Sequence, residues 1–191
     1  CDLLQASVSD LGDQVAKVVA EFGRLDILVN NAGIIRRAPA IDYTEQDWDD
    51  VLHINLRAVF FLSQAAARVM REQGGGSIIN VASMLSFQGG ILVPSYTASK
   101  SAVAGITRAL ANEWASLGIH VNAIAPGYMA TDNTAPLRAD PVRSKAIMDR
   151  IPAARWGTPD DLKGAIVFLA SDAASYVNGA ILPVDGAWLT R

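Results

Sequence analysis

The sequence predicts an α/β domain built around a parallel β-sheet. Short apolar runs alternate with longer segments of helical periodicity along the 191 residues, and this alternation is typical of βαβ units. Each apolar run ends in small or turn-forming residues, which mark strand boundaries. Hydrophobic residues make up 51% of the chain, enough to bury a core. We therefore expect a single domain spanning residues 1–191.

The expected elements follow in chain order. The predicted strands cover residues 25–33, 77–83, 120–127 and 179–186. The predicted helices cover roughly residues 5–21, 45–73, 95–116 and 159–172. Residues 1–4 are expected to be the end of a further strand. Residues 128–150 are polar and contain two prolines, so we expect an irregular loop with a short helix, forming a lid over a site.

Charge and composition exclude several classes of function. A net charge of −3 offers no basic surface for nucleic acid. No apolar run reaches the roughly 18 residues of a membrane span, and the first ten residues do not resemble a signal peptide. The single cysteine, Cys1, cannot form an internal disulfide, which fits a reducing compartment. We expect a cytoplasmic protein that binds a small molecule, with no metal, nucleic acid or membrane as partner.

Tyr96 and Lys100 form the first pair with chemical potential. They begin an apolar stripe on the predicted helix 95–116, at positions 96, 100, 103, 107, 110 and 114. An ammonium group one turn from a phenol favours the phenolate and lowers the tyrosine pKa, which suits a general acid or base. The alternative is a lysine that extends from the helix to solvent. Roughly a quarter of chains of this length contain such a pair by chance, so the pair alone favours the second interpretation.

Ser83 ends the predicted strand "SIINVAS". Parallel sheets bind ligands beyond the carboxyl ends of their strands, so the Ser83 hydroxyl is placed to donate to a substrate oxygen. A loop cap is an equally good explanation for a single serine. Asn55 interrupts the apolar stripe of the helix predicted at 45–73. A buried amide needs partners, and a structural bond to the backbone explains Asn55 more simply than a site.

Loops at two other strand ends suit a flat ligand. Asn-Asn-Ala-Gly at 30–33 follows the first strand, and its small residues let a ligand approach the backbone. Pro126 and Gly127 close the third strand, with Thr131 shortly after. Because the carboxyl ends of parallel strands share one rim, we expect these loops to surround one site.

Together these segments resemble the short-chain dehydrogenase/reductase family. "NNAG", the helical Asn55, "INVAS", "YTASK" and "APGYMAT" occur in the order and spacing of that family, along the whole chain. The resemblance implies a Rossmann-type, doubly wound parallel sheet. It also implies an oxidoreductase that uses NAD, or alternatively NADP, to interconvert a secondary alcohol and a ketone.

The resemblance assigns roles residue by residue. Tyr96 would exchange the proton with the reacting oxygen, and Ser83 would hold that oxygen. Lys100 would bind the nicotinamide ribose and lower the Tyr96 pKa, while Asn55 would anchor a water in a proton relay. Asp2 and Leu3 would meet the adenine. The remaining cofactor-binding positions implied are Asn30, Asn31, Ala32, Gly33, Tyr96, Lys100, Pro126, Gly127, Met129 and Thr131.

One departure from the family pattern concerns the N-terminus. The family begins with a strand, a Thr-Gly-x-x-x-Gly-x-Gly turn and a helix, and the dinucleotide pyrophosphate sits on that turn. This segment does not occur in the 191 residues. We expect an N-terminally truncated Rossmann-type domain, either a fragment of a longer enzyme or a truncated product, that binds NAD(H) poorly and shows little turnover.

Arg36 and Arg37 bear on the substrate. They follow the "NNAG" loop, and guanidinium groups suit carboxylates, although two solvated surface charges explain them equally well. Further segments resemble family members that act on keto sugar acids. The resemblance therefore implies a sugar-acid substrate contacted by Ser83, Tyr96, Arg36 and Arg37. Gluconate 5-dehydrogenase and 3-oxoacyl-carrier-protein reductase activities remain open as alternatives.

The last expectation concerns association. Small residues on the two long predicted helices permit close packing: Ala65, Ala66, Ala67, Ala98, Ala102, Gly105 and Ala109. The family resemblance implies a subunit interface there and a homotetramer. A non-catalytic chain that only associates with intact subunits is the alternative from outside the enzymes. The strand at 25–30 is expected to be an open sheet edge, which favours aggregation.

Overall fold

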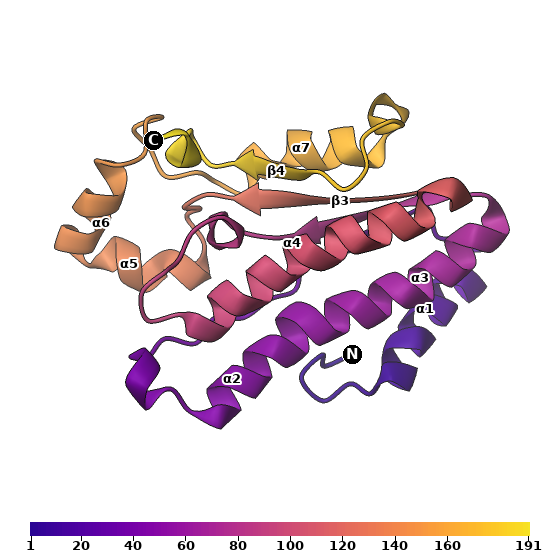
Figure 1. The fold of residues 1–191 in the computed structure, drawn as a ribbon, viewed down its shortest axis with the longest axis horizontal. Helices are drawn as coiled ribbons and strands as arrows, with labels where there is room; N and C mark the ends of the chain where they lie inside the picture. Colours follow the sequence, from indigo (N-terminus) through magenta and orange to yellow (C-terminus); the bar gives the residue numbers. More distant parts are fainter.

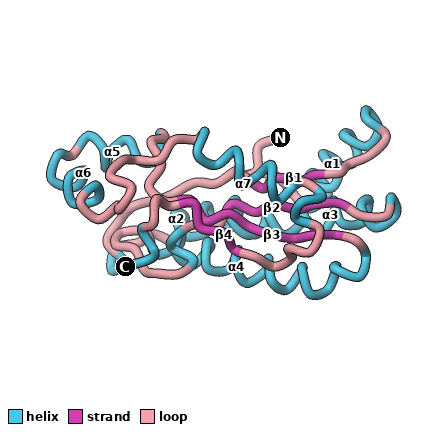
Figure 2. The backbone as a smooth tube through the Cα atoms, turned by 90° about the horizontal axis from the view of Figure 1, so that it is seen from above, coloured by secondary structure: helices cyan, strands magenta, loops and turns pink.

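The computed structural model describes residues 1–191 and contains one four-stranded parallel sheet (Figures 1 and 2). Its strands are β1 (Ile27–Asn30), β2 (Gly76–Val81), β3 (Ile119–Pro126) and β4 (Ile181–Val184). They lie in the order β1-β2-β3-β4, and all three pairings are parallel. The four predicted strands and their parallel arrangement are confirmed.

Seven α-helices connect and flank the strands. They are α1 (Val8–Phe22), α2 (Glu45–Leu52), α3 (Val59–Gln73), α4 (Pro94–Trp114), α5 (Ala135–Ala139), α6 (Pro141–Met148) and α7 (Asp160–Ala170). Local signals fix several ends. Ser7 and Asp10 form a capping box at the start of α1, and the side chain of Thr44 caps α2.

The helix predicted at 45–73 is interrupted. A π-helical turn, His53–Ala58, joins α2 to α3. Both Asn55 and Ala58 in this turn are buried. Single π-helical turns of this kind are frequent at functional sites.

Helices cover both faces of the sheet. Ile78 packs with Met70 of α3 and Leu110 of α4, whereas its neighbour Ile79 packs with Leu169 of α7 on the opposite face. This alternation follows from the two-residue period of a strand. Figure 1 shows α3 and α4 running side by side along one face. The predicted doubly wound, Rossmann-type architecture is confirmed.

Residues 1–4 were predicted as a strand end, and this is wrong. They form an irregular segment and a turn, in which the Gln5 amide donates to the Asp2 carbonyl over 3.3 Å. No residue of this segment pairs with β1, and a strand requires such a partner. No helix of the structure is both long and apolar enough to cross a membrane.

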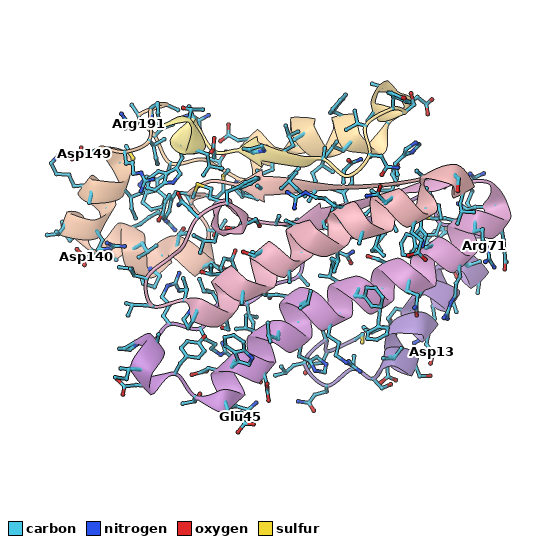
Figure 3. All side chains as sticks on the ribbon, viewed as in Figure 1. Asp13, Glu45, Arg71, Asp140, Asp149 and Arg191 are labelled. Atoms are coloured by element: carbon cyan, nitrogen blue, oxygen red, sulfur yellow. The ribbon has the colours of Figure 1, made fainter.

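The segment 128–150 lies beyond the carboxyl ends of the strands, where Figures 1 and 2 show α5 and α6 projecting from the sheet. It contains a short 3-10 turn and these two helices, in agreement with the predicted loop and short helix. The C-terminus is tied to it, because Arg191 Nη2 donates to the Asp149 carbonyl over 2.9 Å. Figure 3 labels Asp140 and Asp149 at the two ends of α6, with Arg191 near Asp149.

Candidate active site

A cavity of about 410 Å³ opens at the carboxyl ends of β2 and β3. Ser83 and Tyr96 line one side of it, together with Gly127 from the end of β3. The α5–α6 segment lines the opposite side, so it covers the cavity as the lid interpretation requires. The structure therefore brings the predicted hydroxyl groups of Ser83 and Tyr96 to one place.

Tyr96 lies in the first turn of α4, which begins at Pro94. Burial raises the pKa of its phenol above the usual value, and the nearby Ser83 hydroxyl and the charge of Arg37 oppose that rise. We expected Lys100 to depress this pKa. That expectation is wrong for the ligand-free chain, because desolvation is the largest effect and its net result is a raised pKa.

Lys100 is buried one turn further along α4, with only 4% of its surface exposed. Its Nζ donates to the Val81 carbonyl at the end of β2 over 2.6 Å, and lies 5.6 Å from the centroid of the Tyr96 ring. Burial lowers the pKa of Lys100 to about 8. The solvent-directed alternative is therefore excluded, and the lysine points into the region behind Tyr96.

Ser83 combines the two roles that the sequence left open. Its Oγ accepts a hydrogen bond from the Leu85 amide over 3.1 Å, which caps the following turn. The side chain also lines the cavity and is 8% exposed. Because the amide uses the oxygen as acceptor, the hydroxyl proton remains available for a ligand.

Asn55 acts as a clamp on the loop that follows β1. Its Oδ1 accepts from the Ile34 amide and its Nδ2 donates to the Ile34 carbonyl, both over 2.9 Å. Nδ2 also donates to Ser99 Oγ over 3.2 Å. The amide is fully buried and its two protons are used, which agrees with the structural explanation. The predicted role of Asn55 as the anchor of a water in a proton relay stays a prediction.

The loop after β1 provides a close approach to Lys100. A Cβ on Gly33 would lie 3.3 Å from Asn55 Oδ1 and 3.7 Å from Lys100 Nζ, so glycine keeps this backbone open beside the lysine. A cavity of about 70 Å³ lies at the same edge and is lined by Leu3, Asn31 and Ala32, among others. This small cavity is lined mostly by apolar side chains and includes neither Gly33 nor Lys100, so it is the open backbone at Gly33, beside the buried ammonium, that fits the ribose of a nicotinamide dinucleotide.

The side chains of two residues that were predicted to bind the cofactor, Asn30 and Asp2, make other contacts. Asn30 lines part of the small cavity, but its Nδ2 donates into the core, to Asn80 Oδ1 over 2.8 Å and to Ser63 Oγ over 3.0 Å. Its side chain therefore joins structural elements. Asp2 is exposed, and its carboxylate accepts from the Leu4 amide over 3.0 Å, outside this small cavity.

The loop after β3 is held against the C-terminal segment. A Cβ on Gly127 would lie 2.5 Å from the Asp185 Cα, so only glycine fits this approach. Pro126 ends the strand. Met129 is buried and bridges to Gly157, and the Thr131 carbonyl accepts from Arg138 over 3.1 Å. Of these four predicted residues, only Gly127 lines the large cavity.

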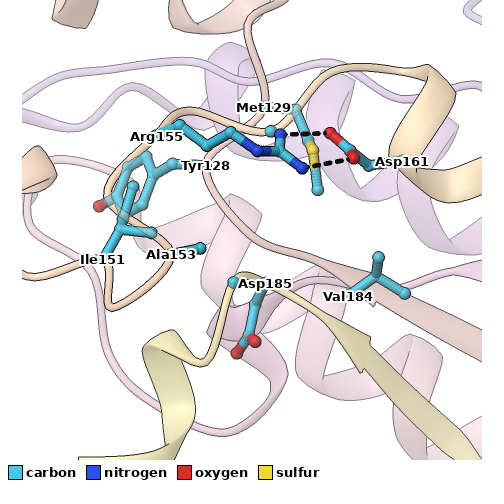
Figure 4. A pocket seen from close by; sticks show the side chains of 10 residues that line it. Tyr128, Met129, Ile151, Ala153, Arg155, Asp161, Val184 and Asp185 are labelled. Carbon is cyan, nitrogen blue, oxygen red and sulfur yellow. Dashed lines mark hydrogen bonds and ion pairs between the residues drawn. The ribbon is translucent and has the colours of Figure 1, made fainter.

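Met129 instead lines a second cavity, of about 180 Å³, shown in Figure 4. Two of its charged side chains pair with each other, because Arg155 makes two hydrogen bonds of 2.7 Å to Asp161, and the Asp185 carboxylate accepts from backbone amides. It contains neither Ser83 nor Tyr96. We therefore place the chemistry in the larger cavity.

The side chains of the adjacent residues Arg36 and Arg37 point to different parts of the structure. Arg37 lines the large cavity, and its Nη2 donates to the Asn133 carbonyl over 2.8 Å. Arg36 points toward α2, where it lies 3.4 Å from both the Asp47 and the Asp50 carboxylates. The expectation that Arg36 contacts substrate is therefore wrong, since two carboxylates already neutralise it.

Sequence reasoning missed four side chains of the large cavity: Gln88, Arg143, Arg150 and Trp188. No motif marks them. The only sequence signal was the lid assignment of 128–150, which contains both arginines. Arg143 and Arg150 carry charge into a cavity whose lining includes no aspartate or glutamate. The site therefore favours anionic ligands.

Comparison with known proteins places these features in context. Residues 4–188 match a family model described as enoyl-(acyl carrier protein) reductase. A 2-dehydro-3-deoxy-D-gluconate 5-dehydrogenase of Dickeya dadantii is 66% identical over 98% of this chain and 76% of its own length. The enzyme of that name from Escherichia coli is also 66% identical, over 92% of this chain and 70% of its own length.

A solved structure extends the comparison to the fold. A gluconate 5-dehydrogenase from Burkholderia cenocepacia, in complex with NADP and tartrate, superposes with a TM-score of 0.96. It is 39% identical, and the match covers 100% of this chain and 74% of that one.

Proposed function

The chain belongs to the short-chain dehydrogenase/reductase family, and on this premise we propose that it interconverts a secondary alcohol and a ketone on a keto sugar acid, with NAD or NADP. The single observation that carries the proposal is the large cavity. There Tyr96 and Ser83 face arginines, and no acidic residue lines the wall. An acid–base pair beside unneutralised guanidinium groups suits a hydroxy or keto acid.

In the proposed reaction, Ser83 donates its hydroxyl proton to the substrate oxygen and holds it beside the Tyr96 phenol. Tyr96 gives a proton to that oxygen when a ketone is reduced and takes it when an alcohol is oxidised. A nicotinamide bound there would supply the hydride, or accept it, at the carbon that carries the oxygen. Lys100 and the backbone at Gly33 would hold the nicotinamide ribose, and Asn55 fixes the Gly33 loop through Ile34.

The pKa of Tyr96 favours one direction at neutral pH. Because burial raises it, the phenol is protonated in the ligand-free chain and ready to donate, as ketone reduction requires. Alcohol oxidation needs the phenolate, so its rate should rise with pH. A protonated Lys100 would favour the phenolate once a ligand excludes water from the site.

Several facts support a sugar acid and a nicotinamide dinucleotide. Two relatives at 66% identity carry the name 2-dehydro-3-deoxy-D-gluconate 5-dehydrogenase, and the Burkholderia structure holds NADP with tartrate, a dicarboxylic acid. Arg37 lines the same cavity and adds to its positive charge. Gluconate 5-dehydrogenase activity uses the same chemistry and remains the nearest alternative.

Reduction and oxidation assays at 340 nm test this function. Because this chain is expected to bind NAD(H) poorly, we expect slow turnover of 2-dehydro-3-deoxy-D-gluconate or D-gluconate at high concentrations of NAD(H) or NADP(H), and still less turnover of an acetoacetyl thioester. Tyr96→Phe should lower kcat by about 10²–10⁴-fold, because it removes the proton donor and keeps the ring. Tyr128→Phe is the matched control, since its ring also lines the cavity without a place in the proposed proton transfer.

Two results would redirect the proposal. Turnover of acyl thioesters without turnover of sugar acids would indicate a 3-oxoacyl-carrier-protein reductase. No turnover with any pair of substrate and cofactor would favour a non-catalytic chain that acts through association.

A further inference from the structure

We propose that Arg150, supported by Arg143, binds the carboxylate of the substrate from the lid side of the large cavity. The inference rests on the proposed sugar-acid function and names the residues that select the acid group. Both arginines line the cavity that contains Ser83 and Tyr96. They come from α6 and the residue pair after it, on the wall contributed by the lid.

The charge of these arginines is available. None of the six ion pairs in the structure includes Arg143 or Arg150. The carboxylate nearest in sequence, Asp149, pairs with Lys145 over 2.6 Å. A carboxylate entering the cavity therefore meets two cations without displacing a protein acid, which favours binding.

The Arg150 guanidinium is also oriented. It stacks on Trp188, with its Cζ 4.1 Å from the ring centroid, and its Nη2 lies 3.4 Å from Gln88 Oε1. The same Oε1 accepts from Trp188 Nε1 over 3.3 Å. Stacking and a shared acceptor hold the plane of the guanidinium, which reduces the entropy lost when its remaining N–H groups bind a carboxylate.

Trp188 is itself fixed in place. It is 4% exposed, and the Asp185 carboxylate accepts from the amides on either side of it, Ala187 over 2.9 Å and Leu189 over 3.0 Å. The C-terminal turn thus provides a rigid platform for Arg150. Arg150 is exposed, and this support from Gln88 and Trp188 is of the kind that holds the side chains of a binding site in position.

Steady-state kinetics with Arg150→Gln test the inference. We expect the KM for D-gluconate or 2-dehydro-3-deoxy-D-gluconate to rise at least about tenfold, with kcat changed far less, because a charge-assisted contact made in both ground and transition states is lost. Arg150→Lys should recover part of the loss. Arg143→Gln should have a smaller effect of the same kind. The KM for NAD(P)H should stay unchanged.

Lys145→Gln is the matched control. It removes one positive charge from the same lid segment, but Lys145 is solvent-exposed, pairs with Asp149 and does not line the cavity. Its KM for sugar acids should equal that of the unsubstituted chain. Thermal midpoints of all variants, within a few degrees of each other, would show that the lid has kept its fold.

The possible results separate the two proposals. If the unsubstituted chain converts sugar acids and Arg150→Gln leaves their KM unchanged, or raises the KM of NAD(P)H instead, the carboxylate site is wrong and the proposed function stands. If the unsubstituted chain neither converts sugar acids nor binds D-gluconate in calorimetric titration with NADP⁺ present, both proposals fail.

Discussion

At the scale of single residues, Lys100 is a cation buried without a carboxylate partner. Its pKa falls to about 8, from 10.5 for a free lysine, because burial disfavours the ammonium. Between these values the folded chain binds fewer protons than the unfolded chain. The free energy of unfolding must therefore rise with pH through this window. Burial of Lys100 therefore lowers the free energy of unfolding at pH 7, and this loss is recovered in alkaline solution.

We predict that Lys100→Met removes this pH dependence. The test is the free energy of unfolding in urea at pH 7 and at pH 10. Between these pH values it should increase by up to about 3 kcal/mol more for the unsubstituted chain than for the variant, which corresponds to the lowering of the Lys100 pKa to about 8. Lys145→Met, at an exposed position, serves as the control. Equal changes for the unsubstituted chain and Lys100→Met would mean that this lysine does not titrate in the window.

At the scale of elements, a buried polar ladder joins two strands to two helices. Asn80 of β2 accepts from Asn30 of β1 over 2.8 Å and donates to Thr107 Oγ1 of α4 over 2.9 Å. Asn30 continues the ladder to Ser63 of α3 over 3.0 Å. All four residues are buried, so each of these hydrogen bonds replaces one to water. Breaking any of them leaves a buried polar group less satisfied, which lowers the free energy of unfolding.

We predict that Asn80→Ala lowers the free energy of unfolding by about 2–4 kcal/mol, because Asn30 loses a buried acceptor and Thr107 loses a buried donor. Asn30 then keeps only its bond to Ser63, and Thr107 only its bond to the Val103 carbonyl. Equilibrium unfolding in urea measures the loss. Asn112→Ala on α4 is the control. Its side chain is exposed and bonds only to the Arg108 carbonyl over 2.8 Å, so its effect should stay below about 0.5 kcal/mol. Equal losses at both positions would show that the ladder stabilises the fold no more than an exposed side-chain hydrogen bond does.

The ladder also shows where sequence reasoning succeeds and fails. The strands, the helix from 94 and the placement of Ser83 and Tyr96 followed from periodicity, because strand ends and helix faces are local properties. The direction of Asn30 did not follow, since a strand-end residue faces either the ligand or the core. Arg36 and Arg37 are adjacent, and only the carboxylates of α2 decide which one turns away.

Arg150 could not be predicted at all. Its orientation depends on Gln88 and Trp188. Gln88 is 62 residues from Arg150 and 100 residues from Trp188 in the sequence. No local pattern records such a contact. The π-helical turn at His53–Ala58 escaped prediction for a similar reason, because the bonds of Asn55 to Ile34 cross between elements.

At the scale of the whole molecule, two surfaces remain without a partner inside the chain. β1 pairs on one side only, with β2, and its Ile27 and Val29 are 44% and 40% exposed. The outer side of α3 and α4 carries an open hollow of about 560 Å³, lined by Leu56, Phe60, Phe61 and Ile106, among others. Apolar surfaces of this kind mark sites of association.

We predict that the chain associates through the outer side of α3 and α4, as expected for a homotetramer. Ala66 and Ala67 are buried within the chain and are not available to a partner, but Gly105 on α4 is exposed and a Cβ there would meet nothing within 4 Å. Gly105→Arg should therefore leave the fold intact, since arginine favours a helix more than glycine does, while its long charged side chain prevents a second helix from packing closely.

Light scattering after size-exclusion chromatography gives the mass of each form. We expect the unsubstituted chain to form an oligomer and Gly105→Arg to shift toward the monomer of 20.2 kDa, with an unchanged circular dichroism spectrum. Gly12→Arg, on α1, is the matched control, because its Cβ also meets nothing within 4 Å and α1 lies outside the proposed interface. A monomeric unsubstituted chain, or an equal shift in both variants, would contradict association through α3 and α4. An oligomer that survives Gly105→Arg but dissociates when Val29→Lys places a charge on β1 would assign the contact to the open sheet edge, where added charge opposes strand pairing.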